Sequence, residues 1–225
     1  MSQVLLNYPK QAAFGRPLPK TKIYEHSGAS AAMRELFVRQ VEQIVWQYKL
    51  APETVNLPAV QSVLEIQVFS ITLKIPELNQ DALRCIDKVV QHPIIFELVH
   101  EGKIQVVAAY KRIKTGVAEG SSAQPEISDY FESEWLPIDS PRVAMPLALN
   151  MGSLYEQILH RLIPLAAREQ ESLSELVSRV GRANALRREI TKTQSKLDKE
   201  KQFNRKVEIN AQLRGLNAEI ERLIQ

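Results

Sequence analysis

The sequence predicts an α+β fold: a mostly antiparallel sheet of about four strands with flanking helices, followed by a C-terminal antiparallel helical hairpin that is coiled-coil-like. Two observations predict it. Before residue 150, β-rich runs alternate with helical stripes, whereas from Ser153 onward apolar residues recur only at three-four spacing. We therefore expect an extended N-terminal arm over residues 1–27, an α+β sheet domain over 28–150 and a helical region over 151–225.

The N-terminal part is divided by prolines. Repeated prolines and poor periodicity predict that residues 1–27 are extended. Residues 31–50 place apolar side chains at helical spacing, which predicts one amphipathic helix with its N-cap within Ser27–Ser30. Pro52 follows it, and the residue before a proline is pushed out of the helical region.

The middle of the chain carries the strand signals. Residues 63–75 alternate and are rich in β-branched side chains, which predicts a long strand. Asn79 is then the expected N-cap of a helix that ends before Pro93.

A hairpin follows this helix. The β-rich runs over 94–100 and 103–113 are separated by Glu101-Gly102, which predicts two antiparallel strands joined by a tight turn. Small and polar residues at 116–126 indicate an exposed loop, and residues 127–136 alternate again as a further strand.

The C-terminal region holds two apolar seams that are out of phase. A turn near Glu200 to Asn204, with Asn204 as N-cap, gives an antiparallel hairpin, and one continuous helix with a stutter is the alternative. Either arrangement leaves apolar surface that a partner would cover. The residues predicted to bind this partner are Leu213, Leu216, Ile220 and Leu223.

Composition argues against a disulfide-rich secreted protein and against a membrane protein. A single cysteine excludes a disulfide framework and fits a reducing compartment. The first twenty residues lack the pattern of a secretory signal, and no window approaches a membrane span. We expect a cytoplasmic protein with no membrane contact.

Positive charge is concentrated near the C-terminus. Residues 187–206 hold eight lysines and arginines against three acidic residues, a local charge of +5 in a chain of net charge +3. Such a segment can bind nucleic-acid phosphates, or it can be the solvated face of a long helix. The candidate nucleic-acid-binding residues are Arg187, Arg188, Lys192, Lys196, Lys199, Arg205 and Lys206.

Signals for catalysis are weak. Glu53, Glu65 and Gln67 follow a predicted helix in the order seen in PD-(D/E)xK nucleases, which use carboxylates to hold a divalent cation. Gln67 stands where that pattern has lysine, and Glu53 lies in a predicted loop. The four histidines are scattered, so we expect no metal site and no cofactor.

Four segments carry a resemblance that spans almost the entire chain. They are LPKTKIYEHSG at 18–28, ELFVRQVEQIVWQYKLAPETVNLPA at 35–59, HPIIFELVHEGKIQVVAAYKR at 92–112 and KEKQFNRKVEINAQLR at 199–214. Together they resemble the bacterial domain-of-unknown-function family 4391. The resemblance implies a short cytoplasmic protein encoded beside SNF2-like helicases and DNA methyltransferases in restriction-like or phage-defence clusters. It transfers no catalytic residue to this sequence.

The functional expectation is therefore a non-catalytic accessory subunit of a bacterial DNA-modification or antiphage defence complex. Its sheet domain and hairpin would dock a larger subunit such as an SNF2-like helicase, a DNA methyltransferase or a nuclease. The alternatives are a metal-dependent nuclease and a DNA-binding module that uses the basic helices.

Overall fold

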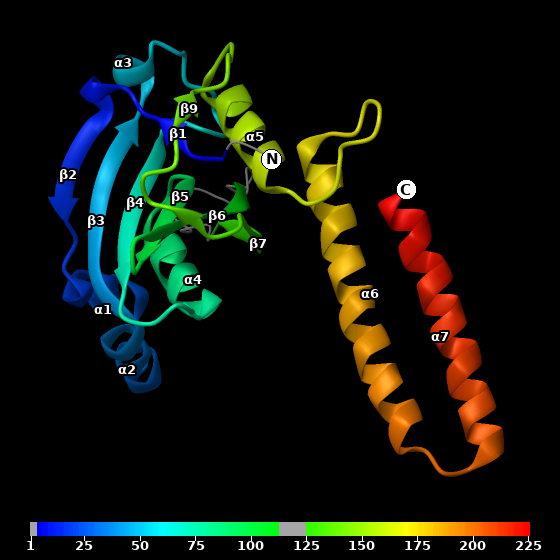
Figure 1. The fold of residues 1–225 in the computed structure, drawn as a ribbon. Coiled ribbons are helices and arrows are strands. Elements are labelled where there is room, and N and C mark those ends of the chain that lie inside the picture. Colours follow the sequence, from blue (N-terminus) through cyan, green and yellow to red (C-terminus); the bar gives the residue numbers. More distant parts are fainter. Residues whose placement is uncertain (1–3, 113–124) are drawn as a thin grey trace, which may run out of the picture. The chain divides into compact units, whose positions relative to one another are not determined.

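The computed structural model describes residues 4–112 and 125–225 (Figure 1). The chain divides into two compact units, Met1–Ile163 and Pro164–Gln225. The loop predicted at 116–126 lies, up to residue 124, outside the described residues.

The first unit is built on one mixed sheet, in which β2 to β7 lie in chain order and β8 adds to β6. Its strands are β2 Ala13–Pro17, β3 Val41–Leu50, β4 Ile66–Leu73, β5 Ile94–His100, β6 Lys103–Arg112, β7 Glu126–Glu132 and β8 Leu136–Pro137. The α+β class is confirmed. The described sheet has seven strands rather than about four, and the β4–β5 pair is parallel.

The parallel pair follows from the connection between its strands. α4 (Gln80–Val89) links β4 to β5, and a helical crossover returns the chain in the same direction. Asn79 caps α4 as predicted, with its side chain accepting from the N–H of Asp81 at 2.8 Å.

The predicted hairpin is confirmed. β5 and β6 pair antiparallel, and the turn residues Glu101 and Gly102 have φ angles of 42° and 73°. Both values lie in the left-handed region, which glycine tolerates without strain, and two such residues fit a tight hairpin turn.

The prediction of one helix over residues 31–50 is wrong in its second half. Ser30 is the N-cap of α2 (Ala31–Gln40) and its side chain accepts from the N–H of Met33, but residues 41–50 form β3. This segment is rich in β-branched and aromatic residues, and it pairs with β2 on one side and β4 on the other. Tertiary pairing therefore outweighs its helical periodicity.

The described N-terminal residues are part of the first unit. β1 (Leu6–Asn7) pairs in parallel with β9 (Val143–Ala144), η1 spans Lys10–Ala12, and β2 adds to the edge of the main sheet. Two further helices are α1 (Lys20–Ser27) and α3 (Pro52–Val55). The prediction that all of residues 1–27 are extended is therefore wrong at its C-terminal end, and Glu53 lies in a short helix rather than in the predicted loop.

The core lies between the sheet and its helices. α1 and α2 contact α4, and the aromatic rings of Phe69, Phe96 and Tyr130 form a row within one buried cluster. Consecutive residues of β6 are all buried from Val106 to Ala109, so this strand is covered on both faces. α5 (Met151–Leu162) contacts β6 and β7.

The second unit is a pair of helices, α6 (Leu173–Lys199) and α7 (Phe203–Ile224), which lie side by side and run in opposite directions (Figure 1). The predicted helical hairpin is confirmed, and the alternative of one continuous helix is wrong. The N-cap position of α7 is Gln202 rather than Asn204, because the helix begins one residue before Asn204.

Candidate functional site

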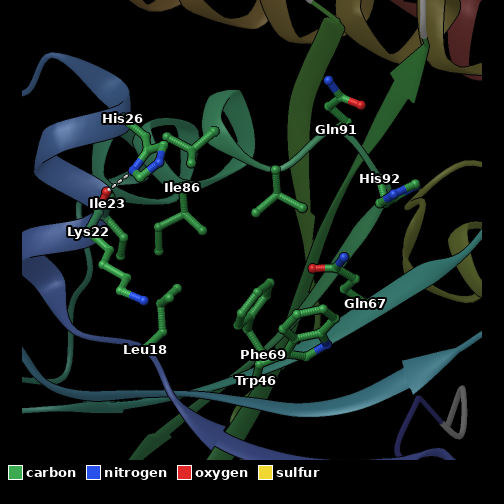
Figure 2. A pocket seen from close by; sticks show the side chains of 12 residues that line it. Leu18, Lys22, Ile23, His26, Trp46, Gln67, Phe69, Ile86, Gln91 and His92 are labelled. Atoms are coloured by element: carbon green, nitrogen blue, oxygen red, sulfur yellow. Dashed lines mark hydrogen bonds between the residues drawn. The ribbon is translucent and has the colours of Figure 1, made fainter.

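The first unit contains a pocket of about 330 Å³ between α1, α4 and the sheet (Figure 2). Trp46 of β3 and Phe69 of β4 form its aromatic side, and Ile86 and Val89 of α4 contribute aliphatic side chains. The volume lies at the lower end of the range for small-molecule sites, which are mostly apolar with a few placed polar groups.

Polar side chains surround this apolar interior. Lys22 and His26 come from α1, Gln67 from β4 and His92 from the segment after α4. The His26 Nδ1 atom lies 2.7 Å from the carbonyl oxygen of Lys22, to which it donates. Among the residues that the structure describes, no aspartate or glutamate lines the pocket, so the formal charge of its described lining is positive.

Gln67 belongs to a cluster of charged groups at one end of the pocket. Its Nε2 atom donates to Oε1 of Glu65 at 2.5 Å, and His92 Nε2 lies 3.6 Å from the same oxygen. The Lys49 ammonium lies 3.3 Å from Oε2 of Glu65 and 3.5 Å from Oε1 of Glu53. Lys49 therefore connects the two carboxylates that the nuclease hypothesis selects.

The structure thus brings Glu53, Glu65 and Gln67 together, although Glu53 belongs to α3, Glu65 immediately precedes β4 and Gln67 lies in β4. Sequence reasoning missed Lys49, whose only local signal is its spacing of four residues from Glu53. The carboxylate of Glu65 raises the pKa of Lys49, because it stabilises the ammonium form. The described residues contain no group of three or more His, Cys, Asp and Glu side chains placed to hold a metal ion.

The second unit carries the basic residues at one end. The hairpin folds the C-terminal turns of α6 against the N-terminal turns of α7, so the predicted nucleic-acid-binding residues gather around the connection between them. We call residues 187–206 the basic tip. Its eight lysine and arginine side chains are all exposed: Arg187, Arg188, Lys192, Lys196, Lys199, Lys201, Arg205 and Lys206.

Three acidic residues of the basic tip offset part of this charge and leave a net charge of +5. Glu200 accepts from the backbone N–H groups of Gln202 and Lys201, and these hydrogen bonds lower the pKa of its carboxyl. Arg205 lies 4.0 Å from Glu200. Glu200 therefore serves mainly to hold the connection between the helices.

Phe203 is a residue that sequence reasoning missed. It is the first residue of α7, and 78% of its surface is exposed among the cations of the basic tip. An aromatic residue placed between Lys201 and Arg205 was the available signal. An exposed ring beside cations is a common arrangement in proteins that bind single-stranded nucleic acid.

The predicted partner-binding residues lie along α7. Leu213 is buried, whereas Leu216, Ile220 and Leu223 are half-buried. α7 contacts α6, and Arg179 of α6 donates to the carbonyl oxygen of Leu223 at 2.8 Å. Part of the predicted partner-binding seam is therefore already buried within the helical pair.

Comparison with known proteins gives one match. A family model described as a domain of unknown function, DUF4391, matches residues 6–220. No curated protein and no solved structure matches the chain. Within the described ranges, no helix combines the length and the apolar character needed to cross a bilayer.

Proposed function

The chain belongs to the DUF4391 family, and we propose that it is an accessory subunit of a bacterial DNA-modification or antiphage defence complex that binds nucleic acid through its basic tip. The association with such complexes rests on what the family resemblance implies. The nucleic-acid contact rests on the charge of the second unit.

The observation that carries this proposal is the clustering of eight exposed cations at one end of the helical pair. A nucleic acid releases condensed counterions when lysine and arginine neutralise its phosphates, and this release is a main source of affinity. Two helix ends that present cations from several turns can contact neighbouring phosphates. Contacts of this kind position a protein without reading the base sequence.

Fluorescence anisotropy with a labelled oligonucleotide, measured over a range of salt concentrations, tests the proposal. The variant in which Arg187, Arg188, Lys192 and Lys196 become glutamine should bind more weakly. Its salt slope should fall by about 0.7–0.9 for each phosphate that the variant no longer neutralises.

A matched control changes four exposed cations of the first unit, Lys10, Arg39, Lys88 and Lys103, to glutamine. This control has the same net charge as the first variant. Equal decreases in affinity in both variants, or binding that is insensitive to salt, would overturn the proposed role of the basic tip.

The accessory role requires a protein partner as well. SNF2-like helicase and DNA methyltransferase subunits are the partners that the resemblance implies, and a nuclease subunit is a further candidate. The first unit and the seam on α7 are the proposed docking surfaces. Changing Leu216 and Ile220 to serine spares the buried Leu213 and should reduce co-purification with the products of neighbouring genes. Unchanged co-purification would exclude the seam as a docking surface.

A metal-dependent nuclease is the second candidate, because Glu53, Glu65 and Lys49 form one cluster. In such a reaction the carboxylates would hold Mg²⁺ or Mn²⁺ and the lysine would support the attacking water. Incubation of the purified protein with DNA and each cation tests this. Cleavage that persists in Glu65→Gln, or intact DNA after long incubation, would remove this candidate.

A further inference from the structure

The pocket of the first unit has polar groups on two sides. The nucleic-acid contact proposed for the basic tip does not involve them. At one end, the Gln67 amide is buried, with 5% of the residue exposed. Because its Nε2 donates to Glu65, its Oε1 must be the atom that faces away from this carboxylate. Figure 2 shows this oxygen turned toward the interior of the pocket. The pocket thus holds an oriented hydrogen-bond acceptor.

At the other side, Lys22 and His26 of α1 line the rim. The Lys22 side chain extends toward the pocket beside Leu18 (Figure 2). Since the described lining contains no carboxylate, it offers the ammonium no anionic partner. An anionic group of a ligand can therefore pair with Lys22 at the solvent-exposed edge, where only part of its hydration is lost.

The interior between these polar groups is apolar. Trp46 and Phe69 lie on the sheet side, and Ile86 and Val89 lie on the side of α4. Trp46 Nε1 donates to the carbonyl oxygen of Tyr48 at 3.0 Å, so the polar edge of the indole is already satisfied and its ring offers apolar contact. Such walls favour a ring system over a flexible polar ligand.

We propose that this pocket binds a small planar anion. An aromatic or heteroaromatic ring would lie between Phe69 and Val89, with an N–H or O–H donor directed at Gln67 and a carboxylate or phosphate beside Lys22. Nucleotides and aromatic carboxylates share this chemistry, and the binding experiment distinguishes them.

Trp46 provides a reporter for binding. The chain has two tryptophans, so the variant Trp135→Phe leaves Trp46 as the single emitter. AMP, CMP and 4-hydroxybenzoate, none of which contains an indole fluorophore, are titrated into it, each beside its neutral counterpart: adenosine, cytidine and 4-hydroxybenzamide. We expect saturable quenching by at least one anion with a Kd below about 1 mM, and a neutral counterpart that binds roughly tenfold more weakly.

Two pocket variants and one control complete the test. Lys22→Ala should reduce binding of the anion to the level of its neutral counterpart, about tenfold. Val89→Phe should fill the pocket and abolish quenching by both, and its fold is checked by circular dichroism. Lys103→Ala, an exposed lysine outside the pocket, should bind like the parent.

The pattern of quenching identifies the class of ligand. Quenching by AMP or CMP alone assigns heterocyclic phosphates to the pocket, and quenching by 4-hydroxybenzoate alone assigns aromatic carboxylates. Absence of saturable quenching in all three pairs overturns the proposal. So does quenching by an anion that Lys22→Ala and Val89→Phe leave unchanged.

Discussion

Nζ of Lys111 lies 3.0 Å from Oδ1 of Asp87, and both side chains are almost completely buried. The same ammonium donates to the carbonyl oxygens of Asp87, Val90 and His92, so it also caps the C-terminal end of α4. Tyr130 donates to the other carboxylate oxygen of Asp87 at 2.6 Å. Burial raises the pKa of Asp87 and lowers the pKa of Lys111, and the hydrogen bonds and opposite charges counteract both shifts.

Removal of the buried Lys111 ammonium should strongly destabilise the first unit. Lys111→Met leaves Asp87 without its charged partner and three carbonyl oxygens without their donor, so we expect a loss of about 3–5 kcal/mol in the free energy of unfolding. Urea denaturation measures it. The neighbouring Arg112→Met removes an exposed ion pair with Glu126 and should cost less than about 1 kcal/mol. Similar losses in the two variants would contradict the assigned role of Lys111.

Arg142 and Glu97 form a second pair that connects distant segments. The guanidinium makes two hydrogen bonds of 2.7 and 3.0 Å to the carboxylate, and it also donates to the carbonyl oxygen of Leu6. Lysine cannot reproduce this bidentate geometry. Arg142→Lys should therefore lower the free energy of unfolding by about 1–3 kcal/mol, and Arg142→Met should lower it further because Glu97 stays buried and unpaired. Thermal unfolding should rank the parent as most stable, followed by Arg142→Lys and then Arg142→Met. Equal stability of Arg142→Lys and the parent would contradict this prediction.

The second unit contains an acid-sensitive contact at the start of α6. Arg179 makes two hydrogen bonds of 2.7 Å to Glu171, and these hydrogen bonds lower the pKa of Glu171 to about 2. A depressed pKa in the folded state means that the contact stabilises the fold above about pH 4.5, the ordinary value, and that this contribution is lost as the pH falls toward 2. The Glu171→Gln variant should therefore lose less stability than the parent when the pH falls from about 4.5 to 2. Circular dichroism against pH measures it, and a parallel pH dependence in both proteins would refute the assignment.

Phe203 should contribute to the affinity of the basic tip for single-stranded DNA but not for double-stranded DNA. Stacking on an unpaired base contributes about 1–3 kcal/mol, so Phe203→Ala should weaken binding of single-stranded DNA with little effect on a duplex. The salt slope should stay unchanged because the variant keeps every cation. Fluorescence anisotropy with both forms of DNA measures the two affinities.

Two controls isolate the ring of Phe203. Val207 lies on the same helix and is 50% exposed. Val207→Ala removes an apolar side chain without a ring and should have little effect on binding of either form of DNA. Phe203→Leu keeps the apolar character without the ring, so full retention of affinity in this variant would indicate hydrophobic contact instead of stacking. Equal decreases in affinity for both forms of DNA would also contradict stacking.

Local chemistry explains where sequence reasoning succeeded. Asn79 caps its helix through a contact two residues away, and Glu101-Gly102 turns the hairpin through the backbone angles of two adjacent residues. The helical pair follows from its apolar spacing. Each of these features depends on residues that are neighbours in the chain, so the sequence displays them directly.

Partners distant in the chain explain where it failed. Residues 41–50 have helical spacing, yet they form a strand because β2 and β4 supply hydrogen bonds on both edges. The sequence did not indicate that Lys49 pairs with Glu65, because this contact forms only when β3 and β4 lie side by side. The pocket likewise requires α1 and α4 to meet the same face of the sheet.

By itself, the amino-acid sequence determined the α+β class, the hairpin, the helical pair and the concentration of cations near the C-terminus, because propensity, turn chemistry and charge are properties of adjacent residues. Only the tertiary structure decided the strand order, the buried pair of Asp87 and Lys111, and the orientation of Gln67 toward the pocket. These depend on which surfaces come together during folding, since a side chain acquires its partner and its burial only from segments that are far away in the chain.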